Sequence, residues 1–357
     1  GLVERFDSTI GANTVVMPFG GQTQLTPAEG MVAKIPALKG EVKTASIMTC
    51  GYNPDLAKWS PFHGGMYAAI ESIARAVALG ANPDKIRLTL QEYFEKLTDE
   101  SSWGKPFAAL LGAYLVQEKL ATPAIGGKDS MSGTFMDKNV PPTLISFAVG
   151  TADANKVVTN EFKTANSSVI FLSCPRDEAE VVDFKLYKEQ LDCVHKAILA
   201  DKVLASATVG LGGIAATISK MCFGNNLGFA FNKEVLDLNS LFVPNIGGLV
   251  LEVANDSLNF FEDIEYLVLG NTLNTPDILI NNTTISLAIA KENWQQTLEP
   301  IFPTTKAALE TAVIDNIYTQ AVPLCYPGNI AKPRVVIPVF PGTNCEYDSK
   351  RAFELAG

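Results

Sequence analysis

The sequence contains little histidine and no closely spaced pair of cysteines. Its two histidines, His63 and His195, are too few and too far apart for a zinc site or for a Ser-His-Asp arrangement. Its six cysteines are scattered, without a Cys-x-x-Cys pair, which is typical of a reduced protein rather than a disulfide-linked secreted one. We therefore predict a cytoplasmic protein.

Long apolar runs and an excess of basic residues are also lacking. No stretch reaches the roughly 20 apolar residues that a membrane-spanning helix needs. The chain has 28 lysines and arginines against 38 aspartates and glutamates, for a net charge of −10, whereas nucleic-acid binding relies on cations that neutralise phosphates. These absences predict that neither a membrane nor a nucleic acid is a partner, so that any anionic substrate must be met by a local site.

The length of 357 residues suits two domains and part of a third, at a prior of about 150 residues per domain. A polar stretch and a proline-rich stretch predict the linkers between them. We expect domains at 1–152 and 166–318, linkers at 153–165 and 319–333, and the incomplete start of a further domain at 334–357. Because the chain begins at Gly1 rather than Met, we interpret it as a piece of a longer protein.

Strand-like and helix-like stretches alternate along the chain, which predicts α/β and α+β domains. The expected helices cover residues 66–79, 178–200 and 214–221, and one more, opened by Pro106, carries an apolar stripe of Phe107, Leu110, Leu111, Tyr114 and Leu115. The expected strands cover residues 86–90, 144–149, 169–172, 249–253 and 334–340.

The stretch from Pro123 to Gly133 gathers the groups that phosphate chemistry uses. It contains Gly126, Gly127, Lys128, Asp129, Ser130 and Ser132. Glycines with positive φ would let backbone N–H groups converge on a phosphate, Lys128 would supply charge, Asp129 would hold Mg²⁺ and Ser130 would donate a hydrogen bond. The spacing is not that of a Walker motif, and a polar hairpin turn with a Lys-Asp pair is an equally good interpretation of this motif alone.

Several segments together resemble the phosphoribosylformylglycinamidine synthase family. They are Leu25–Glu29, Trp59–Gly65, Gly104–Pro106, Gly126–Ser132 and Val339–Cys345, in this order. The last resembles the first strand and turn of that family's class I glutaminase domain, and essentially the whole chain is covered.

This resemblance implies a two-domain synthetase half of the aminoimidazole ribonucleotide synthetase type, the second half of a large single-chain enzyme, followed by a truncated glutaminase stub. Residues 1–152 would be its α/β domain, which builds a shared barrel, and residues 166–318 its α+β domain. The parent would convert formylglycinamide ribonucleotide, glutamine and ATP, with Mg²⁺, to formylglycinamidine ribonucleotide, glutamate, ADP and phosphate in purine biosynthesis. Its partners would be the first synthetase half and the glutaminase domain of the same chain.

The resemblance also assigns roles to individual residues. Gly126, Gly127, Lys128, Asp129, Ser130 and Ser132 would bind nucleotide or substrate, at either the catalytic or the auxiliary site. No complete catalytic set is expected within this piece. Cys345 lies too early for the glutaminase nucleophile, which would fall beyond Gly357, so the piece alone should be inactive.

The family has an auxiliary nucleotide site, and the residues of this chain depart from the pattern of that site. Glu71 matches a metal-ligand glutamate, but Arg75 stands where an asparagine is expected and Lys39 where an aspartate is usual. Thr208 and Gly210 replace a further aspartate and a serine. We predict that this site is weakened or absent, so that ADP binds weakly or not at all. Lys39 and Arg75 would supply positive charge in place of the metal ions. Glu71 and Arg75 are four residues apart, so an ordinary helical ion pair is an equal alternative to a ligand role for Glu71.

Three interpretations remain open. The chain is a synthetase half whose parent is a carbon–nitrogen ligase, or a non-catalytic scaffold that braces the other half, or a relative of the thiamine-phosphate or selenide kinase type, which the glutaminase-like end disfavours.

His63 would need a partner to act catalytically, and His195 is expected to be packed or solvated. Cut from its sister half, the first domain should expose an apolar sheet face and self-pair as a homodimer.

Overall fold

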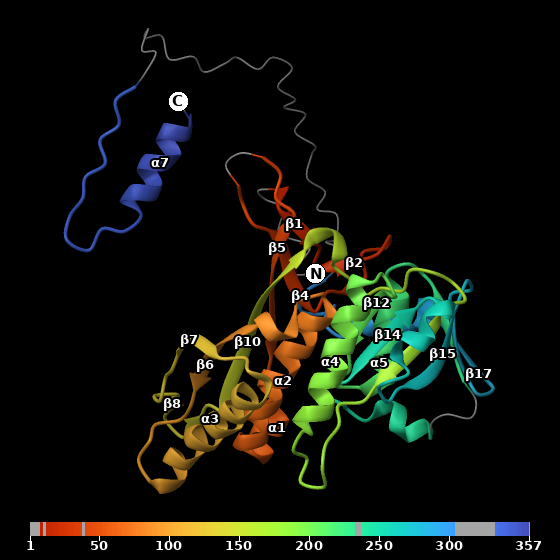
Figure 1. Cartoon of the computed structure of the whole chain (residues 1–357). Helices are drawn as coiled ribbons and strands as arrows, with labels where there is room; N and C mark the ends of the chain where they lie inside the picture. Colours follow the sequence, from red (N-terminus) through yellow and green to blue (C-terminus); the bar gives the residue numbers. More distant parts are fainter. Residues whose placement is uncertain (1–7, 10–11, 38–39, 233–236, 304–332, 357) are drawn as a thin grey trace. The chain divides into compact units, whose positions relative to one another are not determined.

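The structure is a computed structural model, and it describes residues 8–9, 12–37, 40–232, 237–303 and 333–356. The chain divides into two compact units, residues 1–305 and 306–357. The first unit contains both of the large sheets (Figure 1). The division of that unit into domains at 1–152 and 166–318 stays a prediction.

The amino-terminal part of the first unit is a six-stranded sheet with helices on one face. The strand order is β1 (Thr14–Val16), β4 (Gly30–Lys34), β5 (Thr44–Gly51), β10 (Thr143–Asp153), β6 (Arg87–Tyr93) and β7 (Ala124–Lys128). The associated helices are α1 (Pro54–Trp59), α2 (Pro61–Ala78) and α3 (Glu100–Leu120). Neighbouring strands are antiparallel except β6 and β7, which are parallel and joined through α3. The expected strands at 86–90 and 144–149 are thus confirmed as parts of β6 and β10.

Helix α2 is the centre of the unit because nearly all of its side chains are buried. Its start is set by Ser60, the N-cap, and Pro61 at the first helical position. It packs on β5 and β10 and also contacts α3 and α4, so it touches both parts of the unit (Figure 1). The helix expected at 66–79 is confirmed, and it begins one turn earlier.

Two glycines allow α2 and α3 to approach each other closely. A Cβ added at Gly65 would lie 2.1 Å from the carbonyl oxygen of Ala109, and one at Gly112 would lie 1.9 Å from that of Phe62. Both distances are far below van der Waals contact, so glycine is required at these two positions.

The carboxyl part of the first unit is a seven-stranded sheet. Its order is β12 (Val203–Thr208), β14 (Leu249–Val253), β11 (Ser168–Leu172), β15 (Leu267–Leu273), β13 (Gly228–Phe231), β16 (Asp277–Ile280) and β17 (Thr283–Ser286). Its helices are α4 (Phe184–Leu199), α5 (Gly213–Phe223) and α6 (Leu287–Gln296). The strands expected at 169–172 and 249–253 and the helix expected at 214–221 are confirmed.

The remaining elements are short. Two-stranded hairpins are formed by β2 (Phe19–Gly20) with β3 (Thr26–Pro27) and by β8 (Thr134–Phe135) with β9 (Lys138–Asn139). Single 3₁₀ turns are η3 (Pro83–Lys85), η4 (Ala154–Lys156), η5 (Leu238–Phe242) and η6 (Asn255–Phe261).

Three expectations about elements are wrong. Helix α4 starts at Phe184 rather than at residue 178, because Arg176 and Val182 pair across a turn whose residue Asp177 accepts backbone N–H bonds. Helix α3 starts at Glu100, where Asp99 and Ser102 form a capping box, and Pro106 lies inside it. The segment 334–340 forms no strand and has no partner strand among the described residues.

The apolar stripe of α3 lies on the outside of the unit rather than in the core. Phe107 and Tyr114 are 64% and 61% exposed, and Leu110 and Leu111 are also exposed. The face of α3 that packs inward carries mainly small side chains, together with Pro106, Val116 and Leu120.

The second unit is described from residue 333 to residue 356. It contains α7 (Glu346–Ala356), which follows the segment Pro341–Asn344. Cys345 precedes this helix and is exposed.

Candidate functional site

A cavity of about 460 Å³ lies where the two parts of the first unit meet. Its walls come from the segment after β3, the end of β5, helix α2 and the β12–α5 connection. Among the lining residues are Glu29, Tyr52, Glu71, Arg75, Thr208 and Gly210. Four of these, Glu71, Arg75, Thr208 and Gly210, are residues that the sequence assigned to one auxiliary site, and the structure brings them together. Lys39, the fifth, lies outside the described residues.

Glu71 and Arg75 form the helical ion pair that their spacing allows. Arg75 Nη2 lies 2.6 Å from Glu71 Oε1. Arg75 Nη1 donates to the Cys50 carbonyl at 2.6 Å. The other carboxylate oxygen of Glu71 accepts from Tyr52 N–H at 3.0 Å. Burial raises the pKa of Glu71, while the Arg75 charge and the Tyr52 hydrogen bond act to lower it. Both oxygens of Glu71 are therefore engaged by protein groups.

Glu29 is a residue of this cavity that the sequence analysis missed. Its carboxylate accepts from the backbone N–H of Thr208 at 2.9 and 3.1 Å and from Thr208 Oγ1 at 3.0 Å. Burial raises its pKa, opposed first by the charge of Arg75 and then by the Thr208 hydrogen bonds. Thr208, the replacement for an expected aspartate, thus binds a carboxylate from the other part of the unit.

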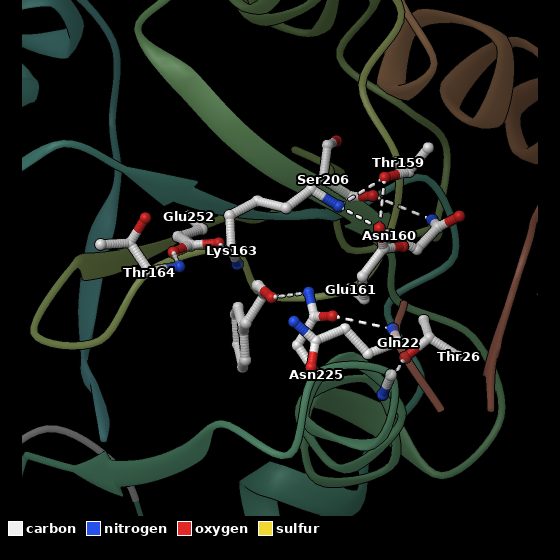
Figure 2. Close-up of polar contacts among 12 residues, drawn as sticks. Gln22, Thr26, Thr159, Asn160, Glu161, Lys163, Thr164, Ser206, Asn225 and Glu252 are labelled. Atoms are coloured by element: carbon white, nitrogen blue, oxygen red, sulfur yellow. Dashed lines mark hydrogen bonds and ion pairs between the residues drawn. The ribbon is translucent and has the colours of Figure 1, made fainter. Parts of the chain in front are cut away.

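Glu29 is held in place by the docking of the β2–β3 hairpin on the end of α5. Gln22 N–H donates to Asn225 Oδ1 at 3.0 Å (Figure 2). Thr26 Oγ1 donates to the Lys220 carbonyl at 2.5 Å and accepts from Gly224 N–H at 2.9 Å. These bonds span about two hundred residues of sequence, which is why no local pattern indicates them.

The back of the cavity carries a polar group without a partner. Asn160 is 3% exposed; its Nδ2 donates to the Ser206 carbonyl at 2.9 Å, but its Oδ1 has no hydrogen-bond partner. Figure 2 shows Asn160 beside Thr159, Glu161 and Lys163, where the Lys163 ammonium forms an ion pair with Glu161. Asn160 is thus a lining residue of the cavity whose Oδ1 is buried without a partner among the described residues.

The second candidate site is the stretch 126–132, at the exposed edge of the first sheet. Gly126 and Gly127 do not form the turn that the sequence predicts, because strand β7 continues through Lys128 and pairs with β6. Neither glycine has a positive φ. Gly127 is needed for a different reason, since a Cβ there would lie 2.5 Å from the Leu90 carbonyl oxygen.

The side chains after this strand are presented to solvent by a fixed backbone. Ser130 N–H donates to the Glu92 carbonyl at 3.0 Å, and Phe94 N–H donates to the Ser130 carbonyl at 2.9 Å. The Lys128 ammonium lies 4.0 Å from the centroid of the Tyr93 ring, and the hydroxyl oxygens of Ser130 and Ser132 are 3.3 Å apart. A cation and two hydroxyls thus lie at or just beyond the carboxyl ends of two parallel strands. None of these residues lines the cavity at Glu71, so the structure holds two separate candidate sites.

The remaining sequence candidates have ordinary surroundings. His63 Nδ1 contacts Ser60 Oγ at 2.8 Å and Nε2 contacts the Ala179 carbonyl oxygen at 2.9 Å. Burial lowers the pKa of His195, whose Nδ1 is buried without a partner. Among the described residues, no group of three or more His, Cys, Asp or Glu could hold a metal ion by itself. Within the same residues, no helix is both long and apolar enough to cross a membrane.

Curated relatives of the chain share one name. The phosphoribosylformylglycinamidine synthase subunit PurL of Thermoplasma volcanium is 21% identical over 335 residues, which cover 84% of this chain and 42% of the relative. The same subunit of Campylobacter lari is 26% identical over 311 residues, covering 80% of this chain and 41% of the relative. The chain spans about two-fifths of the length of these relatives. No family model matches it.

Solved structures agree with these relatives in fold. Thermotoga maritima PurL complexed with ATP has a TM-score of 0.59 at 13% identity, covering 77% of this chain and 47% of that chain. T. maritima PurL complexed with FGAR has a TM-score of 0.59 at 13% identity, with coverages of 76% and 49%. A chain of a HypE–HypF complex has a TM-score of 0.53 at 13% identity, with coverages of 71% and 92%. The chain thus has a mixed α/β fold like that of PurL and of HypE-type proteins, and the resemblance that its motifs indicate is confirmed.

Proposed function

We propose that the chain is part of an ATP-dependent carbon–nitrogen ligase of the phosphoribosylformylglycinamidine synthase type. The observation that carries this proposal is the exposed stretch 126–132, which presents Lys128, Ser130 and Ser132 at the carboxyl ends of the parallel strands β6 and β7. The relatives named PurL, and the likeness to PurL structures with ATP and with FGAR, support it. The parent enzyme would convert formylglycinamide ribonucleotide, glutamine and ATP to formylglycinamidine ribonucleotide, glutamate, ADP and phosphate.

The chemistry explains why such a site needs these side chains. An amide oxygen is a poor leaving group, and its phosphorylation requires charges positioned around the triphosphate. Lys128 would neutralise phosphate oxygens while Ser130 and Ser132 donate hydrogen bonds, and the exposed backbone at Gly126 gives a ligand close access. Asp129 would hold Mg²⁺, which would supply further positive charge to the phosphates.

The place of the chain in the parent is part of the proposal. Residues 1–152 and 166–318 would form the second synthetase half, and residues 334–357 would begin the glutaminase domain, with the first half and the glutaminase as partners. Cys345 would not be the glutaminase nucleophile, so the chain alone would be inactive with glutamine as donor. Five cysteines among the described residues are free thiols, which suits the reducing cytoplasm that we propose for it.

A second candidate function concerns the cavity at Glu71. The network of Glu71, Arg75, Glu29 and Thr208 supports a degenerate auxiliary nucleotide site, in which a fixed guanidinium replaces metal-ion charge. Mg²⁺ is poorly suited to this cavity, because both oxygens of Glu71 already have partners and Arg75 would repel it. In this role the half would be a scaffold that contributes residues 126–132 to a neighbouring catalytic centre.

A calorimetric titration of MgATP and of MgADP into the chain tests the proposal. We expect saturable binding that Lys128→Ala weakens at least ten-fold, because it removes the cation of the exposed site. Lys119→Ala, which removes an exposed lysine at the end of α3, is the matched control and should bind as the wild type does. If Lys128→Ala binds the nucleotide as tightly as the wild type does, the assignment of the nucleotide to this site is wrong. No binding at millimolar nucleotide would favour the scaffold role.

A further inference from the structure

Glu92 is a buried carboxyl group with an oxygen that nothing in the structure satisfies. It lies on β6, on the face that packs against the helices, and opposes Leu144 of β10. The residue is 5% exposed, and its Oε1 is buried without a hydrogen-bond partner in the part of the chain that the structure describes. Leaving such a group unsatisfied is costly, because a carboxylate removed from water needs a cation or donors in its place.

A second carboxyl group, that of Asp129, belongs to the candidate site at 126–132. Asp129 follows β7 directly, and the hydrogen bond from Ser130 N–H to the Glu92 carbonyl fixes its backbone beside β6. Burial raises the pKa of Glu92 to about 7, and the negative charge of Asp129 adds to that rise. In the parallel register of β6 and β7, Gln91 pairs with Lys128, so Glu92 and Asp129 follow at neighbouring positions of the two chain segments.

The basic side chains of this region are engaged elsewhere. Lys105 forms an ion pair with Glu95, and Lys128 lies over the ring of Tyr93. Among the described residues, no ion pair or side-chain hydrogen bond is formed by the carboxylate of Glu92 or of Asp129. Among the described residues, neither carboxyl group thus has a protein cation as its partner, although both lie beside the side chains that we assign to phosphates.

We propose that Glu92 and Asp129 together bind a divalent cation of the Mg²⁺ or Mn²⁺ class, with Glu92 as a ligand that the sequence motif does not include. Mg²⁺ is commonly held by one or two carboxylates while phosphate oxygens and water complete its octahedral shell. Two carboxylates match that donor set, with Lys128, Ser130 and Ser132 on the phosphate side. The assignment of these three side chains to phosphate rests on the proposed function, whereas the cation site itself does not.

The experiment is a titration of the full chain with Mn²⁺ at pH 8, followed by electron paramagnetic resonance of free Mn²⁺, without and with a non-hydrolysable ATP analogue. We expect one bound Mn²⁺ per chain, with an affinity that rises when the analogue is present. Glu92→Gln and Asp129→Asn should each weaken binding at least ten-fold. Asp137→Asn, which changes an exposed carboxylate in the β8–β9 turn, should not.

Thermal unfolding separates loss of the site from loss of the fold. Mn²⁺ should raise the Tm of the wild type, because a ligand of the folded state stabilises it, and should leave the Tm of Glu92→Gln unchanged. A Glu92→Gln variant that binds Mn²⁺ as tightly as the wild type would overturn the proposal, and so would a wild type that binds none with the analogue present.

Failure of this inference can be distinguished from failure of the proposed function. If Lys128→Ala retains nucleotide affinity while Glu92→Gln loses Mn²⁺, the cation site stands and the nucleotide assignment fails. If Lys128→Ala loses the nucleotide while Glu92→Gln keeps Mn²⁺, the nucleotide assignment stands and the cation site fails.

Discussion

Arg75 determines the electrostatic balance of the cavity between the two parts of the first unit. Its guanidinium pairs with Glu71 and donates to the Cys50 carbonyl. Its charge also acts to lower the pKa of Glu29, against the larger effect of burial. Both glutamates are pushed toward the neutral form by burial. Arg75 is one cation that offsets the burial of two carboxyl groups. Its removal should therefore lower the free energy of unfolding by more than the loss of an exposed helical ion pair does, which is about 0.3–0.5 kcal/mol.

We predict that Arg75→Met lowers the free energy of unfolding by about 1–3 kcal/mol at pH 7, the range for leaving a buried polar group unsatisfied. Urea denaturation of the chain measures this. The double variant Glu71→Leu/Arg75→Met should recover part of the loss, because it removes both members of the pair. A single variant as stable as the wild type would show that Glu71 does not depend on Arg75.

Only part of this residue network could be predicted from the sequence. The i, i+4 spacing indicates the Glu71–Arg75 pair because a helix brings such positions together. The bond between Glu29 and Thr208 joins residues 179 positions apart, and it exists because the β2–β3 hairpin docks on α5. Likewise, the sequence places Asp129 in a phosphate-type motif but gives no sign that Glu92, on the neighbouring strand, faces it.

At the scale of elements, hydrophobic periodicity locates helices more reliably than it assigns their buried face. Helix α3 carries the predicted apolar stripe, but Phe107 and Tyr114 point outward while Gly112 and Val116 pack inward. The reason is the short distance between α2 and α3, which only small residues permit. Strand β7 was missed for a related reason: Gly127 is a close-packing residue next to the Leu90 carbonyl rather than a turn residue.

Two glycines of α3 give a matched test of this packing. Gly112→Ala would place a Cβ 1.9 Å from the Phe62 carbonyl oxygen, whereas a Cβ at Gly104 meets nothing within 4 Å. We expect Gly112→Ala to destabilise the unit by several kcal/mol or to prevent folding, since the clash is with backbone. Gly104→Ala should instead stabilise it by about 0.5–1 kcal/mol, through helix propensity. Circular dichroism during thermal unfolding compares the two, and equal Tm values would contradict the close approach of α2 and α3.

At the scale of the whole molecule, the first sheet is covered by helices on one face and carries exposed side chains on the other. Met31 on β4 and Met48 on β5 are opposite each other in register, and they are 46% and 43% exposed. On the covered face, Val32 and Ile47 from the same two strands are fully buried. Such an apolar surface is the feature from which we predicted self-association, because large exposed apolar patches mark interaction sites.

We predict that the chain forms a two-fold dimer through this sheet face, since a symmetric pair brings identical patches together. Light scattering at micromolar concentration should give twice the 38.3 kDa mass of one chain. Met48→Lys places a charge in the patch and should give the monomer mass, whereas Met136→Lys, at an exposed methionine in the β8–β9 turn, should leave the dimer intact. A monomeric wild type at micromolar concentration would contradict self-pairing, and a dimer that survives Met48→Lys would move the interface away from β4 and β5.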